Sequence, residues 1–437
     1  MIKQLILLTN KTITMKKIFI LPFILLSLLA CNENVDFENP AETTSYAFVD
    51  SFYVPFETAL TYAEQMLNKE NGSTRTSTKR KVAEHYEYIT NNATRSTGEN
   101  IDVRFHVINF ENNQGFALVS ADSRTTPVYA YSSTGNLNID ESIENSGFGD
   151  FMDAATEHYA MEIDFTGDLL PVTPTPITPV PTNPIQQLPM VELDGEKYYV
   201  YSVDATISNP GGILVNATWG QGWPYNYYCG ENTNATENYG FRNVAGCGPI
   251  AAAMIMSYHK HPASHNGYTF DWNAITSMSC FPFTFPYIDN NAKAAARLIN
   301  QVGIEANATY GLKTGTTITK ISQMFKDFGY SCTGPSDFNP QNIRTSLNND
   351  LPIYLRGEDS EGNGHAWVVD SYEQNIITNT YYYSYEPFEK YMTKTLQISM
   401  YYHCNWGWKG INNGWFLNVF DGLNNDNKMI YNIQPNN

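Results

Sequence analysis

The stretch from Thr166 to Pro189 limits the folding of this chain more than any other, because prolines and threonines recur throughout it. Proline lacks the backbone N–H that helices and sheets use, and its ring restricts φ, so such a stretch favours an extended chain. We therefore expect residues 166–190 to be a linker between two separately folded parts. A length of 437 residues leaves room for two or three domains.

The first 30 residues have the pattern of an export signal. Two lysines, Lys16 and Lys17, precede an apolar run that is too short to span a membrane comfortably. We interpret residues 1–30 as a signal peptide whose translation starts at Met15, the residues before Met15 reflecting an upstream start.

Cys31 closes the sequence Leu-Leu-Ala-Cys, which resembles a bacterial lipobox. This pattern predicts cleavage before Cys31, a lipid on its sulfur, and a polar tether over residues 31–45. We expect an exported lipoprotein at the outer membrane or cell surface, which cleavage between the two folded parts would release. The alternative is an ordinary secretion signal that happens to contain a cysteine.

Residues 46–165 are expected to form a small α+β domain. Apolar residues recur at helical spacing from Phe56 to Leu67. Two apolar runs, 103–110 and 115–122, then flank an asparagine-rich turn and predict a pair of strands. We see no group in this domain with evident chemistry, and we interpret His106 as a strand side chain rather than a ligand.

Residues 191–437 predict a helical first half and a strand-rich second half. Helical spacing marks two segments, around residues 292–302 and 321–328. Strands are expected later in the chain, at 353–355, 366–372, 376–385, 396–404 and 414–419. We expect residues 381–391 to form a hairpin, and we do not assign residues 192–208 to either domain.

Cys247 is the strongest candidate for a nucleophile. Pro249 suits a first helical turn, and the alanine-rich run that follows favours a helix, so Cys247 should lie at the N-terminus of that helix. Unpaired backbone N–H groups and the helix dipole stabilise a thiolate there. The alternative for a lone cysteine is a small buried apolar side chain. A nucleophile would also need a base.

Three other stretches carry the partners that such a cysteine requires. His365 lies between glycines and a buried strand and is the candidate base. Asn405 ends a later strand and could orient an imidazole, while Trp406 and Trp408 could shield it from water. Gln221 offers a side-chain amide for an oxyanion. The order Gln, Cys, His, Asn is that of papain-like enzymes.

Several motifs also occur together and in this order along the chain. They are Gln-Gly-x-Pro-Tyr-Asn from Gln221, Gly-Cys at Cys247, Met-x-Tyr-His-x-x-Pro from Met256, Gly-His-Ala-x-Val-x-Asp from Gly364, and Asn-Trp-Gly-Trp-x-Gly from Asn405. This set resembles the streptopain family of papain-like cysteine proteases over about residues 212–437. The block Gly115–Ser132 separately resembles the propeptide of streptopain-like zymogens.

The resemblance implies a two-lobed papain-like catalytic domain of α+β class, preceded by the inhibitory domain at 46–165. It implies peptide bond hydrolysis by Cys247 and His365, with Gln221 and the Cys247 N–H as oxyanion donors, and with Asn405, Trp406 and Trp408 supporting the histidine. The substrates would be proteins or peptides, and the chain's own N-terminal domain would inhibit the enzyme. One departure is that Gly248-Pro249 and Met254 replace residues that the family usually carries.

The sequence features that favour a protease disfavour two other functions. A binding lipoprotein with a papain-like shell is disfavoured because all four site positions are kept. A transglutaminase-like acyltransferase is disfavoured by the gap of about 118 residues between Cys247 and His365, and by the Gln221 block.

The charge of the chain and its remaining cysteines indicate which partners, cofactors and disulfides to expect. A net charge of −18 argues against nucleic acid or an anionic membrane face as a partner, so a membrane would be reached only through a lipid on Cys31. No motif for a metal or a nucleotide is found, and we expect no cofactor. Four cysteines remain, and they form two disulfides of undetermined pairing or four separate thiols: Cys229, Cys280, Cys332 and Cys404.

Overall fold

The structure is a computed structural model that describes residues 52–70, 80–93, 98, 100–139, 146–166, 190–193, 196–358, 364–383, 390–420 and 427–436. These ranges belong to one compact unit, residues 50–437. The predicted signal peptide, the tether with Cys31 and nearly all of the predicted linker lie outside the described residues. Within these ranges, no helix combines the length and apolar character needed to cross a membrane.

Most described strands join one antiparallel sheet. Its strand order is β1-β2-β3-β4-β13-β12-β11-β10-β14-β9. Strands β5 and β6 join it alongside β11. The bounds of the strands in this sheet are β1 Val82–Ala93, β2 Asn100–Phe110, β3 Phe116–Ser120, β4 Val128–Ser132, β5 Met190–Leu193, β6 Glu196–Ser208, β9 Tyr330–Asp337, β10 Ile353–Glu358, β11 Gly364–Tyr383, β12 Lys390–Asn405, β13 Gly414–Leu417 and β14 Lys428–Pro435. A two-residue pair, β7 Ser264–His265 and β8 Tyr268–Thr269, stands apart.

The α-helices of the described residues fall into two groups. Helices α1 and α3 belong to the N-terminal part, and the others to the part that carries Cys247. Their bounds are α1 Phe56–Glu70, α3 Ser146–Thr166, α4 Cys247–His259, α5 Trp272–Ile275, α6 Asn290–Glu305, α7 Ile318–Asp327 and α8 Pro340–Asn348.

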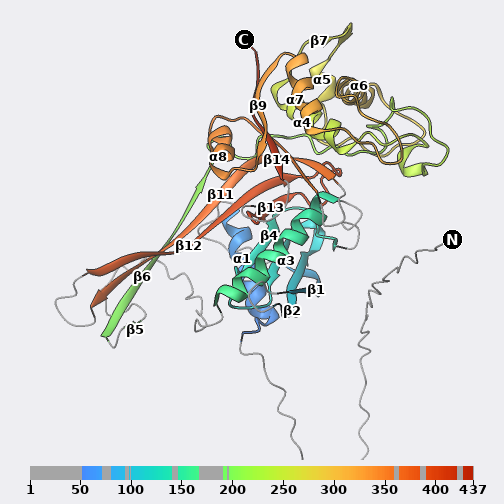
Figure 1. The fold of residues 1–437 in the computed structure, drawn as a ribbon. Helices are drawn as coiled ribbons and strands as arrows, with labels where there is room; N and C mark the ends of the chain where they lie inside the picture. Colours follow the sequence, from blue (N-terminus) through green and yellow to red (C-terminus); the bar gives the residue numbers. More distant parts are fainter. Residues whose placement is uncertain are drawn as a thin grey trace, which may run out of the picture. The chain divides into compact units, whose positions relative to one another are not determined.

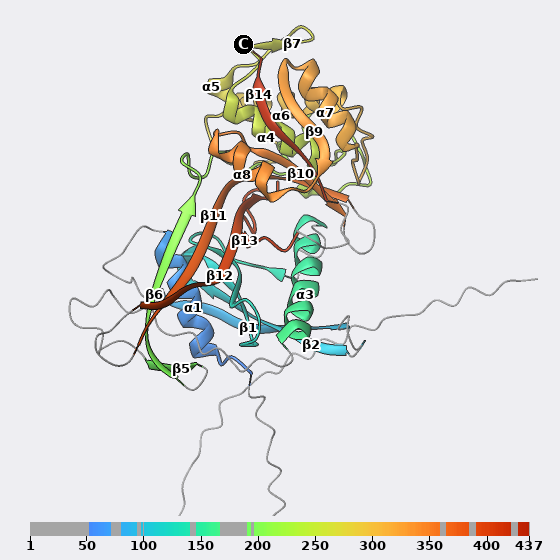
Figure 2. The same cartoon turned by 60° about the vertical axis from the view of Figure 1, so that its left-hand side comes forward.

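In the N-terminal part, helices α1 and α3 pack on strands β1 to β4 (Figure 2). The helix from Phe56 and the pairing of β2 with β3 confirm the sequence prediction, because the apolar side chains of these segments face one core. Strand β1 and helix α3 were not predicted. Strand β1 alternates polar and aromatic residues and has few apolar ones, so its pairing with β2 stabilises it rather than its own composition.

In the C-terminal part, α4, α6 and α7 pack on one another and on strands β9 to β11 and β14 (Figure 1). Helix α4 is apolar on all sides, and residues 248–257 are buried, so it is the central helix of this core. The side chains of Asp289 and Thr317 accept backbone N–H groups at the N-termini of α6 and α7.

One prediction about the strands is corrected by the structure. Residues 366–372 and 376–385 were expected to form two strands, but Gly364–Tyr383 is one strand, β11. It continues through the polar residues between the two runs because β12 lies along one edge and β6 along the other. The described residues of the unassigned segment 192–208 lie in β5 and β6, which pair with each other, and β6 lies beside β11 of the C-terminal part.

The N-terminal and C-terminal parts share one sheet and one core. Strand β4 pairs with β13 through Tyr131 opposite Trp415 and Ala130 opposite Phe416. The Tyr401 hydroxyl donates to the Val128 carbonyl, 2.9 Å away. The N-terminal part thus adds strands to the edge of the C-terminal sheet, a common way of holding one chain segment on another.

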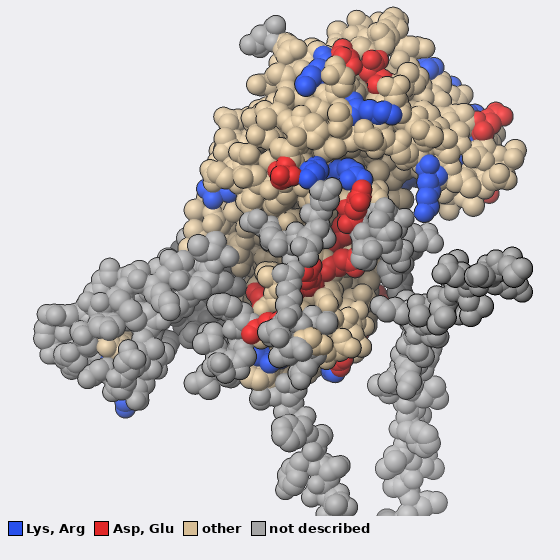
Figure 3. Space-filling view, viewed as in Figure 1, with Lys and Arg blue, Asp and Glu red and all other residues tan. Residues whose placement is uncertain are grey.

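Charged side chains are sparse on the surface. On the face seen in Figure 3, Lys, Arg, Asp and Glu are scattered among uncharged residues, and the described Lys and Arg side chains form no continuous patch there. This distribution agrees with the low charged fraction of the sequence, 16%.

Candidate active site

Cys247 is the first residue of α4, as the sequence predicted. The preceding residue, Gly246, has φ of 92°, and a Cβ there would lie 2.8 Å from Cγ2 of Thr314, so only glycine fits this sharp entry into the helix. Cys247 is partly exposed, while the residues after it are buried. The thiol therefore stands at the positive end of a buried helix.

The pKa of the Cys247 thiol lies below the ordinary value for cysteine. Burial by itself would raise this pKa, but the positive charge of His365, a hydrogen bond from His365, and hydrogen bonds from the backbone N–H groups of Ala366 and Gly248 together outweigh burial. His365, the candidate base of the sequence, thus lies close enough to Cys247 to stabilise the thiolate.

His365 begins strand β11 and is almost completely buried. Its Nε2 lies 3.0 Å from the backbone carbonyl oxygen of Trp406. A carbonyl oxygen only accepts hydrogen bonds, so Nε2 carries the hydrogen and Nδ1 is the nitrogen left to take a proton from the thiol.

The prediction that the Asn405 side chain orients His365 does not agree with this geometry. The Asn405 amide donates to the Ala217 carbonyl at 2.8 Å, and its oxygen accepts the Gly407 N–H at 3.4 Å. The bond expected from Asn405 is instead made by the main chain of the next residue. Asn405 ends β12 with its side chain turned toward the 209–217 segment, which leaves the Trp406 carbonyl facing the imidazole.

The two tryptophans of the predicted shield have different positions. Trp408 lies parallel to the His365 ring, with centroids 6.0 Å apart and planes 20° apart. Trp406 is fully buried and packs against Trp367 and Phe416. Trp408 therefore covers the imidazole face, whereas Trp406 contributes its carbonyl oxygen and a buried indole.

Backbone hydrogen bonds hold the Gln221 segment next to Cys247 and Trp408. Its carbonyl oxygen accepts the Ala245 N–H at 2.9 Å, two residues before Cys247. On the other side, Gly220 forms a β-bridge with Trp408, and the Lys409 N–H donates to the Trp219 carbonyl at 3.1 Å. The Gln221 segment thus lies between the cysteine loop and the tryptophan that covers His365.

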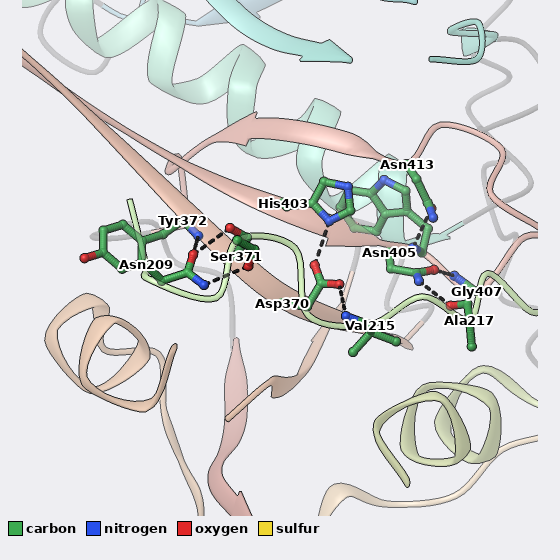
Figure 4. Close-up of polar contacts among 12 residues, drawn as sticks. Asn209, Val215, Ala217, Asp370, Ser371, Tyr372, His403, Asn405, Gly407 and Asn413 are labelled. Atoms are coloured by element: carbon green, nitrogen blue, oxygen red, sulfur yellow. Dashed lines mark hydrogen bonds and ion pairs between the residues drawn. The ribbon is translucent and has the colours of Figure 1, made fainter. Parts of the chain in front are cut away.

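A polar network fixes the segment that leads to Gln221 (Figure 4). The buried Asp370 accepts from His403 Nδ1 at 2.6 Å and from the Val215 N–H at 3.0 Å. Asp370 lies at a register shift between β11 and β12, which turns its carboxylate out of the regular alternation. Asn209 bonds the neighbouring Ser371 through its side chain, at 2.6 Å. These contacts anchor residues 209–217 to β11, which carries His365, and to β12, which ends directly before Trp406.

Helix α3 of the N-terminal part lies directly against His365. A Cβ atom at Gly147 would be 2.1 Å from Cδ2 of the imidazole, so only a glycine allows this approach. The next residue, Phe148, packs edge-on against Trp406, with centroids 6.4 Å apart. Gly147 was not predicted from the sequence, because nothing in its local pattern indicates a contact with a residue so far along the chain.

The departure at Gly248 from the streptopain-like pattern has a steric explanation. A Cβ at Gly248 would lie 3.0 Å from Cγ2 of Thr316 and 3.1 Å from the Tyr354 hydroxyl, so these side chains occupy the space that a larger residue would need. Tyr354 is buried next to the thiol: burial, and then the negative charge of Cys247, raise its pKa well above the ordinary value. The sequence signal for Tyr354 was only its place in the strand before His365.

The cysteines other than Cys247 do not form disulfides in the described part of the chain. Burial raises the pKa of Cys229 to about 12 and raises those of Cys332 and Cys404. Of the two alternatives left by the sequence, the structure has separate thiols. The pKa of Cys247 is lowered, in contrast to those of Cys229, Cys332 and Cys404.

A thiolate at a helix N-terminus, paired with a histidine whose far nitrogen is held by an acceptor, defines a cysteine peptidase site. An N-terminal domain whose helix covers that histidine defines a zymogen. Residues 219–416 match the peptidase C10 family, and residues 48–159 match the Spi protease inhibitor family. The chain is therefore a cysteine peptidase with a peptidase C10 domain of the streptopain family and an inhibitor propeptide domain.

The chain is similar to several characterised proteins. It is 24% identical over 352 residues to streptopain of Streptococcus pyogenes, covering 71% of this chain and 72% of the relative. It is 22% identical over 382 residues to the thiol protease/hemagglutinin PrtT of Porphyromonas gingivalis, covering 77% of this chain and 38% of PrtT. A solved fragment of prointerpain A of Prevotella intermedia aligns with a TM-score of 0.49 and 16% identity, over 80% of this chain and all of the fragment.

Proposed function

We propose that this chain is an endopeptidase in which the Cys247 thiolate attacks the carbonyl carbon of a peptide bond. His365 gives its proton to the departing amine as the C–N bond breaks, and then takes a proton from the water that hydrolyses the thioester. The observation that carries this proposal is the lowered pKa of Cys247, caused by His365 against the effect of burial.

The oxyanion formed during this attack would be held by the Cys247 backbone N–H and the Gln221 side chain. The position of Cys247 at the start of α4 supports the first donor, because the early N–H groups of a helix have no partner within it. The bond from Ala245 to Gln221 supports the second. A donor of this kind is typically worth roughly 3 kcal/mol of transition-state stabilisation.

The orientation of His365 would depend on the Trp406 carbonyl, with Trp408 excluding water from the imidazole face. The bond at 3.0 Å to Trp406 and the parallel ring of Trp408 support these roles. Asn405 would act indirectly: its hydrogen bond to the Ala217 carbonyl would hold the segment that leads to Gln221 in place.

The propeptide would inhibit the enzyme by covering His365, without separating it from Cys247. The close approach of Gly147 to the imidazole supports the proposal that the propeptide covers His365. The effect of His365 on the Cys247 pKa supports the proposal that these two residues stay together in the zymogen. A substrate chain could not pass His365 while α3 lies there. Activation would then require a cut in the Pro-rich linker and departure of the N-terminal domain.

Export and lipid attachment are proposed on the sequence pattern alone. Residues 1–30 would direct export, and Cys31 would carry the lipid that holds the zymogen at the outer membrane or cell surface. A cut in the linker would release the catalytic domain from that anchor. Radiolabelled palmitate should enter the full-length protein and should be absent from Cys31→Ala.

The test of the proposed function is incubation of the purified full-length chain with a reductant. We expect a shorter species whose N-terminus lies between Leu169 and Gly212, together with hydrolysis of a peptidyl-aminomethylcoumarin substrate. Cys247→Ala should stay full length and inactive. Maturation of purified Cys247→Ala at the wild-type rate would contradict self-processing, and an inactive but matured wild type would contradict the peptidase mechanism.

A further inference from the structure

Three aromatic residues, Trp223, Phe241 and Phe285, pack on one another near the active site, and Phe283 is linked to them through Lys409. We call these four residues the aromatic platform. Phe285 packs edge-on against Trp223, with centroids 5.2 Å apart, and against Phe241 at 5.8 Å. Phe241 and Phe283 are 47% and 45% exposed, whereas Trp223 is buried. Clustered exposed rings of this kind mark a binding surface more often than isolated apolar residues do.

The aromatic platform is continuous with the active site through Lys409. The Lys409 amine donates to the Trp223 carbonyl at 2.9 Å and lies 5.6 Å from the centre of the Phe283 ring. Lys409 directly follows Trp408, the residue that covers the imidazole of His365. Trp223 in turn lies two residues after Gln221. The platform is therefore connected along the chain to two segments of the candidate site, through Trp223 to Gln221 and through Lys409 to Trp408.

The chemistry of the reaction decides on which side of the scissile bond this surface lies. His365 protonates the departing amine, so the residues that follow the scissile bond leave past His365 and its cover, Trp408. A chain extended along this path advances about 3.3 Å per residue. Because Lys409 directly follows Trp408, we assign the second or third residue after the scissile bond to Lys409 and the aromatic platform.

We propose that the aromatic platform is a substrate subsite that selects apolar, preferably aromatic, side chains at the second or third residue after the scissile bond. This inference rests on the proposed function, because it takes its direction from His365 acting as the acid. An aromatic side chain fits because the exposed rings offer faces and edges for stacking. The platform keeps its exposure while the propeptide is bound, so its rings are not part of the inhibitory contact.

The experiment uses the full-length chain after activation by a reductant, with two internally quenched peptides. The peptides differ only in having Phe or Ser at both the second and third positions after the scissile bond. A peptidyl-aminomethylcoumarin substrate, which ends at its leaving group, is measured in parallel. The variants are Phe283→Ser and, as a control with a similarly exposed apolar side chain on α6, Ile304→Ser.

We expect the wild type to prefer the Phe peptide by about tenfold in kcat/KM, the size typical of one apolar contact in a subsite. Phe283→Ser should reduce this preference to about twofold, with coumarin hydrolysis unchanged, while Ile304→Ser keeps both values. A wild type that does not distinguish the peptides, or a Phe283→Ser variant with the full preference, would overturn the inference. If the wild type hydrolyses none of the three substrates, the proposed function itself fails.

Discussion

Gly147 is the position where a single methyl group should loosen the propeptide. In Gly147→Ala, the new Cβ would lie 2.1 Å from Cδ2 of His365 and 3.0 Å from its Cγ and Nε2. The imidazole has little room to move away, because Nε2 is bonded to the Trp406 carbonyl and the ring lies parallel to Trp408. Helix α3 must therefore shift by about 1.5 Å to bring the two carbons to a van der Waals separation of about 3.5 Å.

The size of the effect follows from the cost of such overpacking. Inserting a methyl group into a packed site typically costs about 1–3 kcal/mol, and the better helix propensity of alanine returns up to about 1 kcal/mol. A net loss of about 1–2 kcal/mol weakens the hold of the propeptide about 5- to 30-fold, since 1.36 kcal/mol is a factor of ten. The fold of each part should persist, because the contact lies between the two parts rather than within either one.

The assay compares full-length wild type, Gly147→Ala and Gly149→Ala. Gly149 lies in the same helix, and a Cβ there meets nothing within 4 Å, so it controls for the change in helix propensity. Before any cut occurs, Cys247 of Gly147→Ala should be alkylated about 5- to 30-fold faster by iodoacetamide, and coumarin hydrolysis should appear after a shorter lag. Equal lags and alkylation rates for Gly147→Ala and wild type would refute the proposed cover, as would the same acceleration in Gly149→Ala.

Three further predictions concern the catalytic domain. Because His365 lowers the Cys247 pKa and burial raises that of Cys332, alkylation of Cys247 in the activated enzyme should slow less than alkylation of Cys332 as the pH falls below a free cysteine's pKa of about 8.5. Parallel pH profiles for the two thiols would contradict this. His365→Ala should abolish peptide hydrolysis with an unchanged circular dichroism spectrum, whereas Gln221→Ala keeps roughly 1% of kcat; a fully active His365→Ala enzyme would end the mechanism. Asn405→Ala removes the amide that donates to the Ala217 carbonyl. We expect the free energy of unfolding to fall by about 1–3 kcal/mol and the variant to keep measurable activity. Complete inactivation of a fully folded variant would instead indicate that the Asn405 side chain orients His365.

The main residues of the candidate site could be identified from the sequence because each of them belongs to a local sequence pattern. Cys247 is identified by Pro249 and the alanine-rich run that begin α4, and these act within one or two helical turns. His365 is identified by glycines before a buried strand. The paired strands and helix of the propeptide domain follow from apolar periodicity in the same way, and the motif order supplied the family.

The connections between these participants required the tertiary structure. The sequence places an asparagine beside a tryptophan, but whether a side chain or a carbonyl meets His365 depends on where β12 ends and which way Asn405 turns. The single strand β11 in place of two depends on β6 and β12 flanking its polar middle. The register shift at Asp370 is likewise set by the pairing of two strands, and it decides which backbone group that carboxylate holds.

The same reason explains why the inhibitory contact was not foreseen. Gly147 is one of many glycines in the chain, and its local sequence does not distinguish it from Gly149 two residues later. Only the packing of α3 against the strand that carries His365 gives one of them an imidazole at contact distance and leaves the other in open space. Patterns within a few residues determine which elements form and which chemical groups they carry, whereas contacts between distant segments are decided by packing and strand register, which depend on the whole chain at once.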